Sequence, residues 1–181
     1  MTREEFVETF VVRRLKDDEI VQSFDCGDED LNDFILNDAT KYQKAMLAVT
    51  YLVENKATKR IAAFFSLAND RISNAEFPSG NAFKRFKNEH FRAKLMRNYP
   101  AVKLCRFGVD ESMRQQSIGR IIVNFIKIYF LTDNKTSCRF ITVDAYPTAT
   151  GFYEKNDFVC LKAHQKDNDT DFLYYDLYNA L

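Results

Sequence analysis

The sequence predicts a mixed α/β fold in which a sheet is covered by helices. Short apolar stretches that suit strands alternate with amphipathic stretches that suit helices, and two of the strands follow one another directly. The 181 residues are 46% hydrophobic and 29% charged, which is typical of a globular chain. With no repeat or linker in the sequence, we expect a single domain over residues 1–181.

The first third of the chain predicts a strand, a helix and a hairpin. Residues 7–15 are expected to form the first strand. Residues 28–44 predict a helix, because acids occupy the first turn and lysines the last, as the helix dipole prefers. Strands are expected at 46–54 and 61–69, and the short polar connection between them indicates a hairpin.

The rest of the chain continues the alternation after one unusual interval. Residues 77–100 begin with the turn signal Pro-Ser-Gly and continue as a basic segment with interspersed aromatic residues. A buried strand is then expected at 101–109 and a helix at 117–131. The last predicted elements are a strand at 138–146, a short helix at 148–156, and strands at 158–163 and 172–178.

The cysteines, histidines and apolar runs exclude several classes of protein. The cysteines at positions 26, 105, 138 and 160 form no C-x-x-C pair, and His90 and His164 are far apart. We therefore predict buried free cysteines, solvated or hydrogen-bonded histidines and no metal site. No apolar run approaches the ~18 residues of a membrane span. The start MTREEFVETF lacks the plan of a signal peptide, so we expect a cytoplasmic protein.

The net charge of zero conceals an uneven distribution. Residues 1–40 carry 12 acids and 4 bases, residues 41–103 carry 4 acids and 13 bases, and residues 104–181 carry 10 acids and 9 bases. We expect the central basic block to influence the choice of partner more than the overall charge does.

The most informative segment is residues 109–120, VDESMRQQSIGR, which joins a buried strand to a helix. Backbone N–H groups in such a turn point outward, and the helix dipole adds partial positive charge, so the segment predicts an anion site. Arg114 and Arg120 add full charges, and a pyrophosphate is the natural guest.

This segment resembles the Q/R-x-x-G-x-G/A signature of the GNAT N-acetyltransferase superfamily, in the form Arg114-x-x-Ser117-x-Gly119. The strand LCRFGVD before it resembles the family's fourth strand, and residues 152–158 (FYEKNDF) are similar to its FYEKxGF element. The resemblance implies a mixed, mostly antiparallel central sheet flanked by helices. It also implies an N-acetyltransferase that transfers the acetyl group of acetyl-CoA to a primary amine.

The resemblance assigns two groups of residues to the cofactor. The strand end supplies a backbone donor for the thioester oxygen, and the loop and helix start bind the pyrophosphate. The first group is Phe107, Gly108 and Val109, and the second is Arg114, Gln115, Gln116, Ser117, Ile118, Gly119 and Arg120.

Two positions depart from the family pattern. Ser117 replaces the first loop glycine, and Asp157 replaces the glycine of the FYEKxGF element. A serine at positive φ costs about 1–2 kcal/mol. The alternative is that Ser117 caps the following helix or donates its hydroxyl to a phosphate. A reading as a non-catalytic acetyl-CoA sensor rests on these departures alone.

The resemblance places Tyr153 near the CoA sulfur as the general acid, and the alternative is one more core aromatic. Asp110, Glu111 and Asp144 are candidates for a base, although each also suits a structural role, and water can serve instead. Arg106, a charge inside an apolar strand, either orients substrate or cofactor or pairs with an internal acid.

Residues 24–54 and 99–110 (YPAVKLCRFGVD) resemble one GNAT branch, which contains the acetyltransferase toxins of toxin–antitoxin modules and free-standing relatives. Those toxins acetylate the α-amine of aminoacyl-tRNA. The resemblance therefore implies tRNA as a substrate and an antitoxin as a partner, and relatives are often homodimers. The alternative acceptor is a small-molecule or protein amine with no RNA involved.

The basic interval within residues 83–99 is the candidate RNA surface. Its bases suit phosphates, and its aromatic residues suit stacking on unpaired bases. The alternative is a solvated helix face anchored to the core by its aromatic side chains. The bases are Lys84, Arg85, Lys87, Arg92, Lys94 and Arg97, and the aromatics are Phe83, Phe86, Phe91 and Tyr99.

Overall fold

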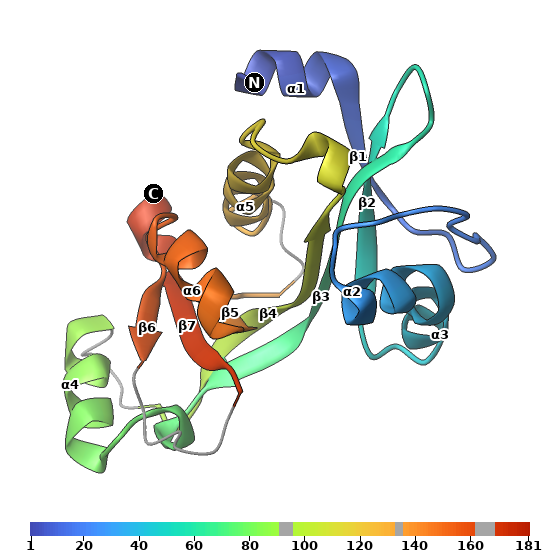
Figure 1. Cartoon of the computed structure of the whole chain (residues 1–181). Helices are drawn as coiled ribbons and strands as arrows, with labels where there is room; N and C mark the ends of the chain where they lie inside the picture. The colour runs from blue at the N-terminus through green and yellow to red at the C-terminus, as the bar shows by residue number, and fades with distance from the viewer. Residues whose placement is uncertain (91–95, 133–135, 162–168) are drawn as a thin grey trace. The chain divides into compact units, whose positions relative to one another are not determined.

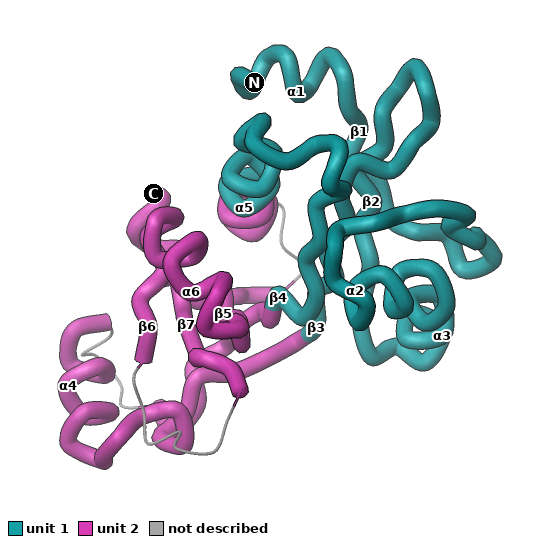
Figure 2. Tube along the Cα trace, in the orientation of Figure 1, with its two compact units in different colours: residues 1–68, 104–125 teal, residues 69–103, 126–181 magenta. Residues whose placement is uncertain are grey.

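The computed structural model describes residues 1–90, 96–132, 136–161 and 169–181 (Figure 1). Its contacts divide the chain into two units, each made of two segments distant in sequence (Figure 2). Unit 1 contains residues 1–68 and 104–125, and unit 2 contains residues 69–103 and 126–181. No linker marks the division, since two strands and one helix each run from one unit into the other.

The described strands form one mixed sheet in the order β1-β2-β3-β4-β5-β7-β6. The pairs β1–β2, β2–β3, β5–β7 and β6–β7 are antiparallel and β4–β5 is parallel, which confirms the predicted fold class. The strands are β1 (Phe10–Arg14), β2 (Val49–Asn55), β3 (Ile61–Ile72), β4 (Tyr99–Val109), β5 (Phe140–Ala145), β6 (Val159–Leu161) and β7 (Asp171–Asp176).

Helices occupy most of the predicted helical segments. The α-helices are α1 (Arg3–Thr9), α2 (Glu29–Asp33), α3 (Ala39–Lys44), α4 (Gly80–His90), α5 (Ile118–Tyr129) and α6 (Pro147–Glu154). A π-helical turn spans Phe34–Asp38, and 3₁₀ turns span Asn74–Glu76, Glu111–Met113 and Leu177–Ala180. In the described part of the chain, no helix is long and apolar enough to cross a membrane.

The prediction of a first strand at 7–15 is wrong at its start, because α1 extends to Thr9. Thr2 and Glu5 form a capping box: the Thr2 hydroxyl accepts from the Glu5 N–H (3.2 Å), and the Glu5 carboxylate accepts from the Thr2 N–H (2.8 Å). These bonds stabilise a helical first turn, so the strand begins only at Phe10.

The predicted helix at 28–44 is present as α2, the π turn and α3 in succession. Asp28 caps it, and its carboxylate accepts from the Leu31 N–H at 3.0 Å. The π turn widens the helix at Phe34 and Ile35, which are both buried, whereas Tyr42 is 41% exposed. The apolar face is therefore shifted from the one an unbroken α-helix would present.

The predicted hairpin is confirmed by the β2–β3 pairing, in which Leu52 lies opposite Phe64. Phe64 is fully buried and lies at the centre of the unit 1 core, with its ring 5.2 Å from Phe24 and 6.1 Å from Phe34. This core packs the segment before α2 against the β2–β3 hairpin, through Leu52 and Phe64.

The unit 2 core is built from aromatic rings. Phe86 of α4 contacts Phe140 of β5 (5.3 Å), Tyr174 of β7 (5.4 Å) and Tyr99 of β4 (5.5 Å). In the same unit, α6 packs on β5 and β7 (Figure 1). Helix α4 therefore owes its place to the aromatic residues of the basic interval.

Thr50 and Ser66 share a buried hydrogen bond of 2.7 Å between neighbouring strands of the hairpin, and both side chains are fully buried. We expect Ser66→Ala to lower the free energy of unfolding by about 1–3 kcal/mol, because the Thr50 hydroxyl loses its partner without gaining water. The double variant Thr50→Val with Ser66→Ala removes both polar groups and should recover most of that loss. Urea unfolding of the three variants tests this, and equal destabilisation of the single and double variants would contradict it.

Candidate active site

The loop between β4 and α5 is held in an unusual backbone shape. Asp110 begins it by donating its N–H to the Ala62 carbonyl (2.9 Å) and by accepting from the Ser112 N–H (3.1 Å). Gln115 and Ser117 both have positive φ, at 63° and 62°. Left-handed residues in such a turn direct successive N–H groups to one side, which makes a concavity that suits an anion.

Ser117 has the left-handed backbone conformation, which is the strained one of the two alternatives that the sequence left open. Its φ is positive, so its backbone has the conformation of the family's glycine. It also lies directly before α5, and its carbonyl accepts from the Ile121 N–H at 3.1 Å. Ser117 therefore occupies the N-cap position as well, at a backbone cost of about 1–2 kcal/mol.

The first turn of α5 adds further backbone N–H groups that suit an anion. The N–H groups of Ile118, Gly119 and Arg120 precede the first intrahelical hydrogen bonds and lie at the positive end of the helix dipole. Ile118 and Ile122 are buried and fix this end of the helix in unit 1, while Arg120 is exposed.

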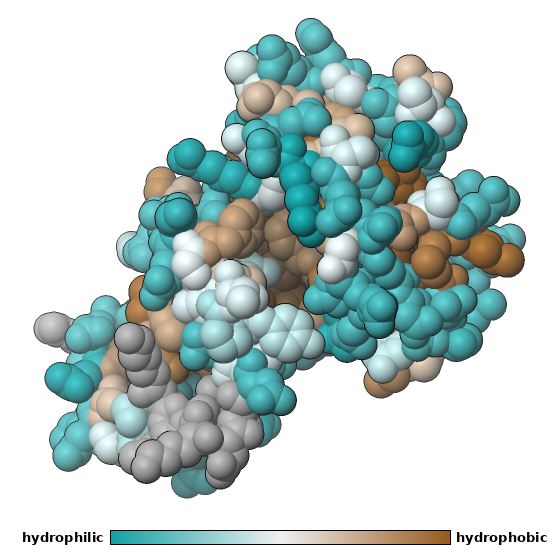
Figure 3. All heavy atoms as spheres, viewed as in Figure 1, coloured by the Kyte–Doolittle hydropathy of each residue, from teal (hydrophilic) through white to brown (hydrophobic). Residues whose placement is uncertain are grey.

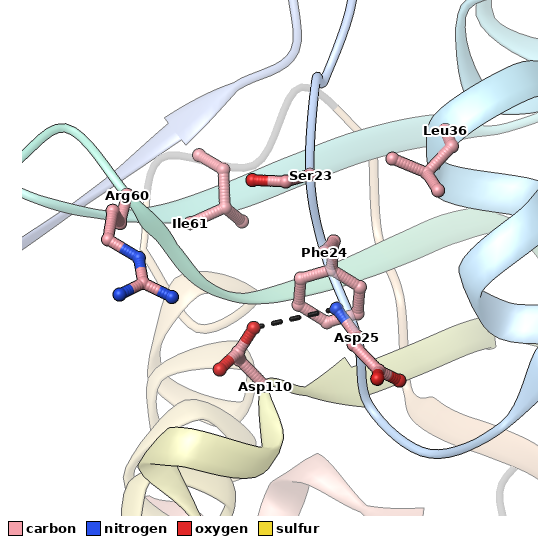
Figure 4. Close-up of a pocket in the computed structure, with 7 residues that line it drawn as sticks. All are labelled: Ser23, Phe24, Asp25, Leu36, Arg60, Ile61 and Asp110. Carbon is pink, nitrogen blue, oxygen red and sulfur yellow. Dashed lines mark hydrogen bonds between the residues drawn. The ribbon is translucent and has the colours of Figure 1, made fainter.

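The sequence did not predict that residues 25–27 brace this loop. The Asp25 carbonyl accepts from the Glu111 N–H (2.9 Å), and the Asp25 N–H donates to the Asp110 carboxylate (3.5 Å; Figure 4). The Arg114 guanidinium donates to the Cys26 carbonyl and pairs with Glu111 at 3.2 Å. Arg114 therefore stabilises the loop, in addition to the phosphate contact that the sequence suggested.

Gly27 shows how closely the two segments approach. Its φ is +74°, and a Cβ at this position would lie 2.5 Å from a Glu111 carboxylate oxygen and 2.9 Å from the Arg114 guanidinium. The pattern Asp-Cys-Gly-Asp in the sequence was a visible turn signal, but nothing in it named the loop as its partner.

A pocket of about 270 Å³ lies where the brace, β3 and the end of β4 meet within unit 1 (Figure 4). One wall is apolar and the other carries two carboxylates and a guanidinium. The carboxylate of Asp25 accepts from the Gly27 N–H and the Asn32 amide, and these bonds lower its pKa. The lining residues are Ser23, Phe24, Asp25, Leu36, Arg60, Ile61 and Asp110.

The end of β4 has the tight backbone approach that Gly108 predicted. A Cβ on Gly108 would lie 2.8 Å from the Phe64 ring and 3.2 Å from the Phe24 ring. The β4–β5 ladder pairs only Ala101–Lys103 of β4, so it stops well before the strand ends at Val109. The described pairing with β5 therefore does not reach the strand end, where the resemblance implies a backbone donor for the thioester oxygen.

Arg106 pairs with an acid, but Asp30 is 65% exposed and is not the internal acid that one of the two predicted alternatives named. Its Nε lies 3.8 Å from the Asp30 carboxylate, and its guanidinium lies 5.5 Å from the centre of the Phe34 ring. Phe107 and Val109 on either side of Gly108 are half-buried.

The three candidate bases all have partners within the chain. Asp110 caps the 3₁₀ turn, Glu111 pairs with Arg114, and Asp144 pairs with the Lys103 ammonium. These contacts support the structural role for each acid.

Tyr153 is a buried side chain of α6 in unit 2, with its ring 5.2 Å from Phe152 and 5.4 Å from Phe158. Burial raises the pKa of the phenol, so the group stays protonated at neutral pH. Its carbonyl accepts from the N–H groups of Asn156 (2.9 Å) and Phe158 (3.1 Å), which fixes the turn after the helix. Asp157 in that turn has φ of 66°, which explains the family's glycine there.

The basic face of α4 presents charges but not aromatic rings. Lys84 and Arg85 are exposed, and the Lys87 ammonium lies 4.9 Å from the centre of the Phe83 ring. Phe83 and Phe86 are 6% and 4% exposed, so they anchor the helix and do not offer a stacking surface. Phe91, Arg92 and Lys94 lie outside the described residues.

The prediction of buried cysteines is correct for Cys26 alone, because Cys105, Cys138 and Cys160 are half-buried. The four cysteines are free, and within the described residues no three potential ligands gather. His90 bonds the Phe86 carbonyl through Nδ1 at 3.0 Å, which confirms its hydrogen-bonded role, and His164 lies outside the described residues.

The contacts at Gly108 predict the outcome of a paired glycine substitution. Gly108→Ala should lower the free energy of unfolding by about 1–3 kcal/mol, because its Cβ overlaps two buried rings. Gly151→Ala is the matched control: it lies on α6 with nothing within 4 Å, so it should raise stability by about 0.5–1 kcal/mol. Urea unfolding measures both, and a Gly108→Ala protein as stable as the parent would contradict the packing described.

Comparisons with known proteins agree with the fold described above. The family model "Acetyltransferase (GNAT) domain" matches residues 87–178, which is half of the chain and includes both the loop and Tyr153. A crystal structure of a KacT mutant is 19% identical with a TM-score of 0.76, and covers 94% of this chain and 96% of its own. AtaT complexed with acetyl-methionyl-tRNAfMet is 20% identical with a TM-score of 0.74 and the same two coverages.

AtaTR bound with AcCoA is similar as well, at 20% identity and a TM-score of 0.71, with 95% of this chain and 96% of that chain covered. At these identities the structural neighbours establish the fold, and the family model establishes the family. The chain belongs to the GNAT acetyltransferase family and is an acetyl-CoA-dependent N-acetyltransferase.

Proposed function

We propose that this chain transfers the acetyl group of acetyl-CoA to the α-amine of aminoacyl-tRNA, and that the loop after β4 binds the pyrophosphate of acetyl-CoA. The observation that carries the cofactor site is the pair of left-handed residues, Gln115 and Ser117, directly before α5. They direct loop N–H groups toward the same anion as the free N–H groups of the helix start.

The residues present suit a pyrophosphate. The N–H groups of residues 117–120 bind its oxygens, and the exposed Arg120 adds a charge without needing to leave an internal partner. The guanidinium of Arg114 instead keeps the loop in its binding shape through Cys26. Gln115 and Gln116 add polar side chains at the rim of the site.

The proposed chemistry is attack of a neutral amine on the thioester carbonyl. A C–N bond forms, the oxyanion accepts a backbone N–H from residues 107–109, and the C–S bond breaks. The amine loses its proton to water, the leaving sulfur takes the phenolic proton of Tyr153, and the resulting phenolate regains a proton from water. Arg106, already paired with Asp30, orients the acceptor.

The bases of α4 support an RNA acceptor, because the exposed Lys84 and Arg85 and the half-buried Lys87 give one helix a run of positive charge. The complex of the neighbour AtaT with acetyl-methionyl-tRNAfMet supports the same class of acceptor. The burial of Phe83 and Phe86 favours the second candidate, a small-molecule or protein amine, since stacking on bases is lost.

An antitoxin is the protein partner that the acidic N-terminal block suits. Glu29, Asp30 and Asp33 are exposed on α2, where Figure 3 shows a hydrophilic surface. The neighbour AtaT binds the C-terminus of its antitoxin AtaR. A basic peptide would match the sign of this surface here.

Tyr153→Phe tests the general acid. The ring keeps its contacts with Phe152 and Phe158, so the fold is retained while the proton is lost. We expect kcat to fall by more than about tenfold, with the Kd for acetyl-CoA within about twofold of the parent. Tyr174→Phe, which removes another buried hydroxyl of unit 2, is the control and should leave kcat unchanged. An unchanged kcat in Tyr153→Phe would remove the role.

Labelled acetyl transfer identifies the acceptor. Acetyl-CoA is offered with charged tRNA, with deacylated tRNA and with a panel of small amines. We expect label in charged tRNA only, and loss of that transfer by at least about tenfold when Lys84, Arg85 and Lys87 become Glu. Lys16, Lys41 and Lys44→Glu, exposed bases of unit 1, give the same change in net charge and should retain transfer. Label in the amine panel alone would establish the second candidate.

A further inference from the structure

Lys127 is a buried charge that the chemistry above does not use. Its side chain, on the part of α5 that belongs to unit 2, is 6% exposed. The ammonium donates to the Asn156 carbonyl at 2.7 Å and lies 3.5 Å from the Asp157 carboxylate. It also lies 3.9 Å from the centre of the Tyr175 ring and 5.7 Å from that of Phe158. A lysine is buried in this way only where its partners compensate for lost water.

Three of these partners, Asn156, Asp157 and Phe158, belong to the turn that follows Tyr153. The N–H groups of Asn156 and Phe158 both donate to the Tyr153 carbonyl, and the Asn156 amide donates to the Phe152 carbonyl at 2.7 Å. The Phe158 ring, which faces the ammonium, also contacts the Tyr153 ring. Lys127 therefore holds the backbone and one of the rings that fix the position of Tyr153.

Asp157 has an explanation in the same contact. Its φ of 66° would suit glycine, and its side chain is 83% exposed, so packing does not require it. Its carboxylate instead supplies negative charge to Lys127, while Asn156 supplies a carbonyl dipole. The ion pair with Lys127 thus explains why this chain has Asp157 where the family has glycine.

We propose that Lys127, with Asp157 as its counter-charge, is a positioning residue that holds Tyr153 where its proton transfer occurs. This inference rests on the proposed role of Tyr153 as general acid. Lys127 touches neither reactant, and it acts through the Asn156 carbonyl and the Phe158 ring. A small displacement of the Tyr153 phenol lowers the rate of proton transfer to the sulfur without changing the affinity for acetyl-CoA.

A double-mutant cycle between Lys127 and Tyr153 tests the proposal. Lys127→Met keeps an unbranched apolar side chain between the rings and removes the donor. We expect kcat to fall by about tenfold, the KM for acetyl-CoA to stay within about twofold, and Lys127→Arg to recover most of the rate. In the Tyr153→Phe background, Lys127→Met should cause no further loss of kcat, because the proton it helps to place is absent.

Two outcomes overturn the proposal in distinguishable ways. If Tyr153→Phe lowers kcat but Lys127→Met costs the same factor with and without the phenol, Lys127 acts independently of Tyr153. If Tyr153→Phe alone leaves kcat unchanged, the general acid is lost and the positioning role with it. Equal falls in kcat and in the folded fraction of Lys127→Met, seen by circular dichroism, would likewise reduce Lys127 to a structural residue.

Asp157→Gly provides a second variant that keeps the fold. Glycine adopts the positive φ without strain, so the turn retains its shape and only the carboxylate is lost. We expect kcat to fall by about threefold at unchanged KM, again only while Tyr153 is present. Full parental kcat in both Asp157→Gly and Lys127→Met would exclude the positioning role.

Discussion

The presentation of backbone N–H groups at the start of α5 is the constraint on which the functional part of unit 1 depends. A loop with two left-handed residues, neither of them glycine, is not stable in isolation. Here the cost is offset by contacts outside the loop: Asp110 is tied to β3, Glu111 to the Asp25 carbonyl, and Arg114 to the Cys26 carbonyl. Phe24, directly before the brace at residues 25–27, packs on Phe64. The core of the hairpin therefore supports the brace, and the brace supports the loop that we propose as the anion site.

Sequence reasoning identified the elements that carry strong periodicity. The β2–β3 hairpin, β4, α5 and α6 all lie close to their predicted ranges, since their apolar patterns are long enough to be unambiguous. The start of β1 was misplaced although Thr2 and Glu5 carry the capping-box signature, because apolar residues at 10–12 dominated the assignment. The π turn at Phe34–Asp38 left no signal, because it depends on how that face packs.

The sequence indicates which segment forms the proposed site, but it does not predict the backbone angles or the side-chain contacts within that segment. The loop motif indicated the segment that we propose as the anion site, but a sequence pattern cannot give the φ of Ser117, and it cannot show that the Arg114 guanidinium already has a partner. The basic interval illustrates the opposite case. Its alternating basic and aromatic residues suggested one surface that binds phosphates and stacks on bases. In the helix, however, the two kinds of side chain lie on different faces: the rings of Phe83 and Phe86 pack in the core, and the charges face water.

The brace has a consequence for where the catalytic domain should be considered to begin. Cys26 and Gly27 lie far upstream of residues 87–178, the part of the chain that matches the family model. A fragment confined to those residues would keep the loop sequence but lose the carbonyl that receives Arg114 and the backbone that supports Glu111. Exchanging the signature segment between relatives therefore transplants only half of a binding element. Residues 25–27 have to be exchanged together with the signature segment. We also expect substitutions in one of these two segments to be accompanied by compensating substitutions in the other.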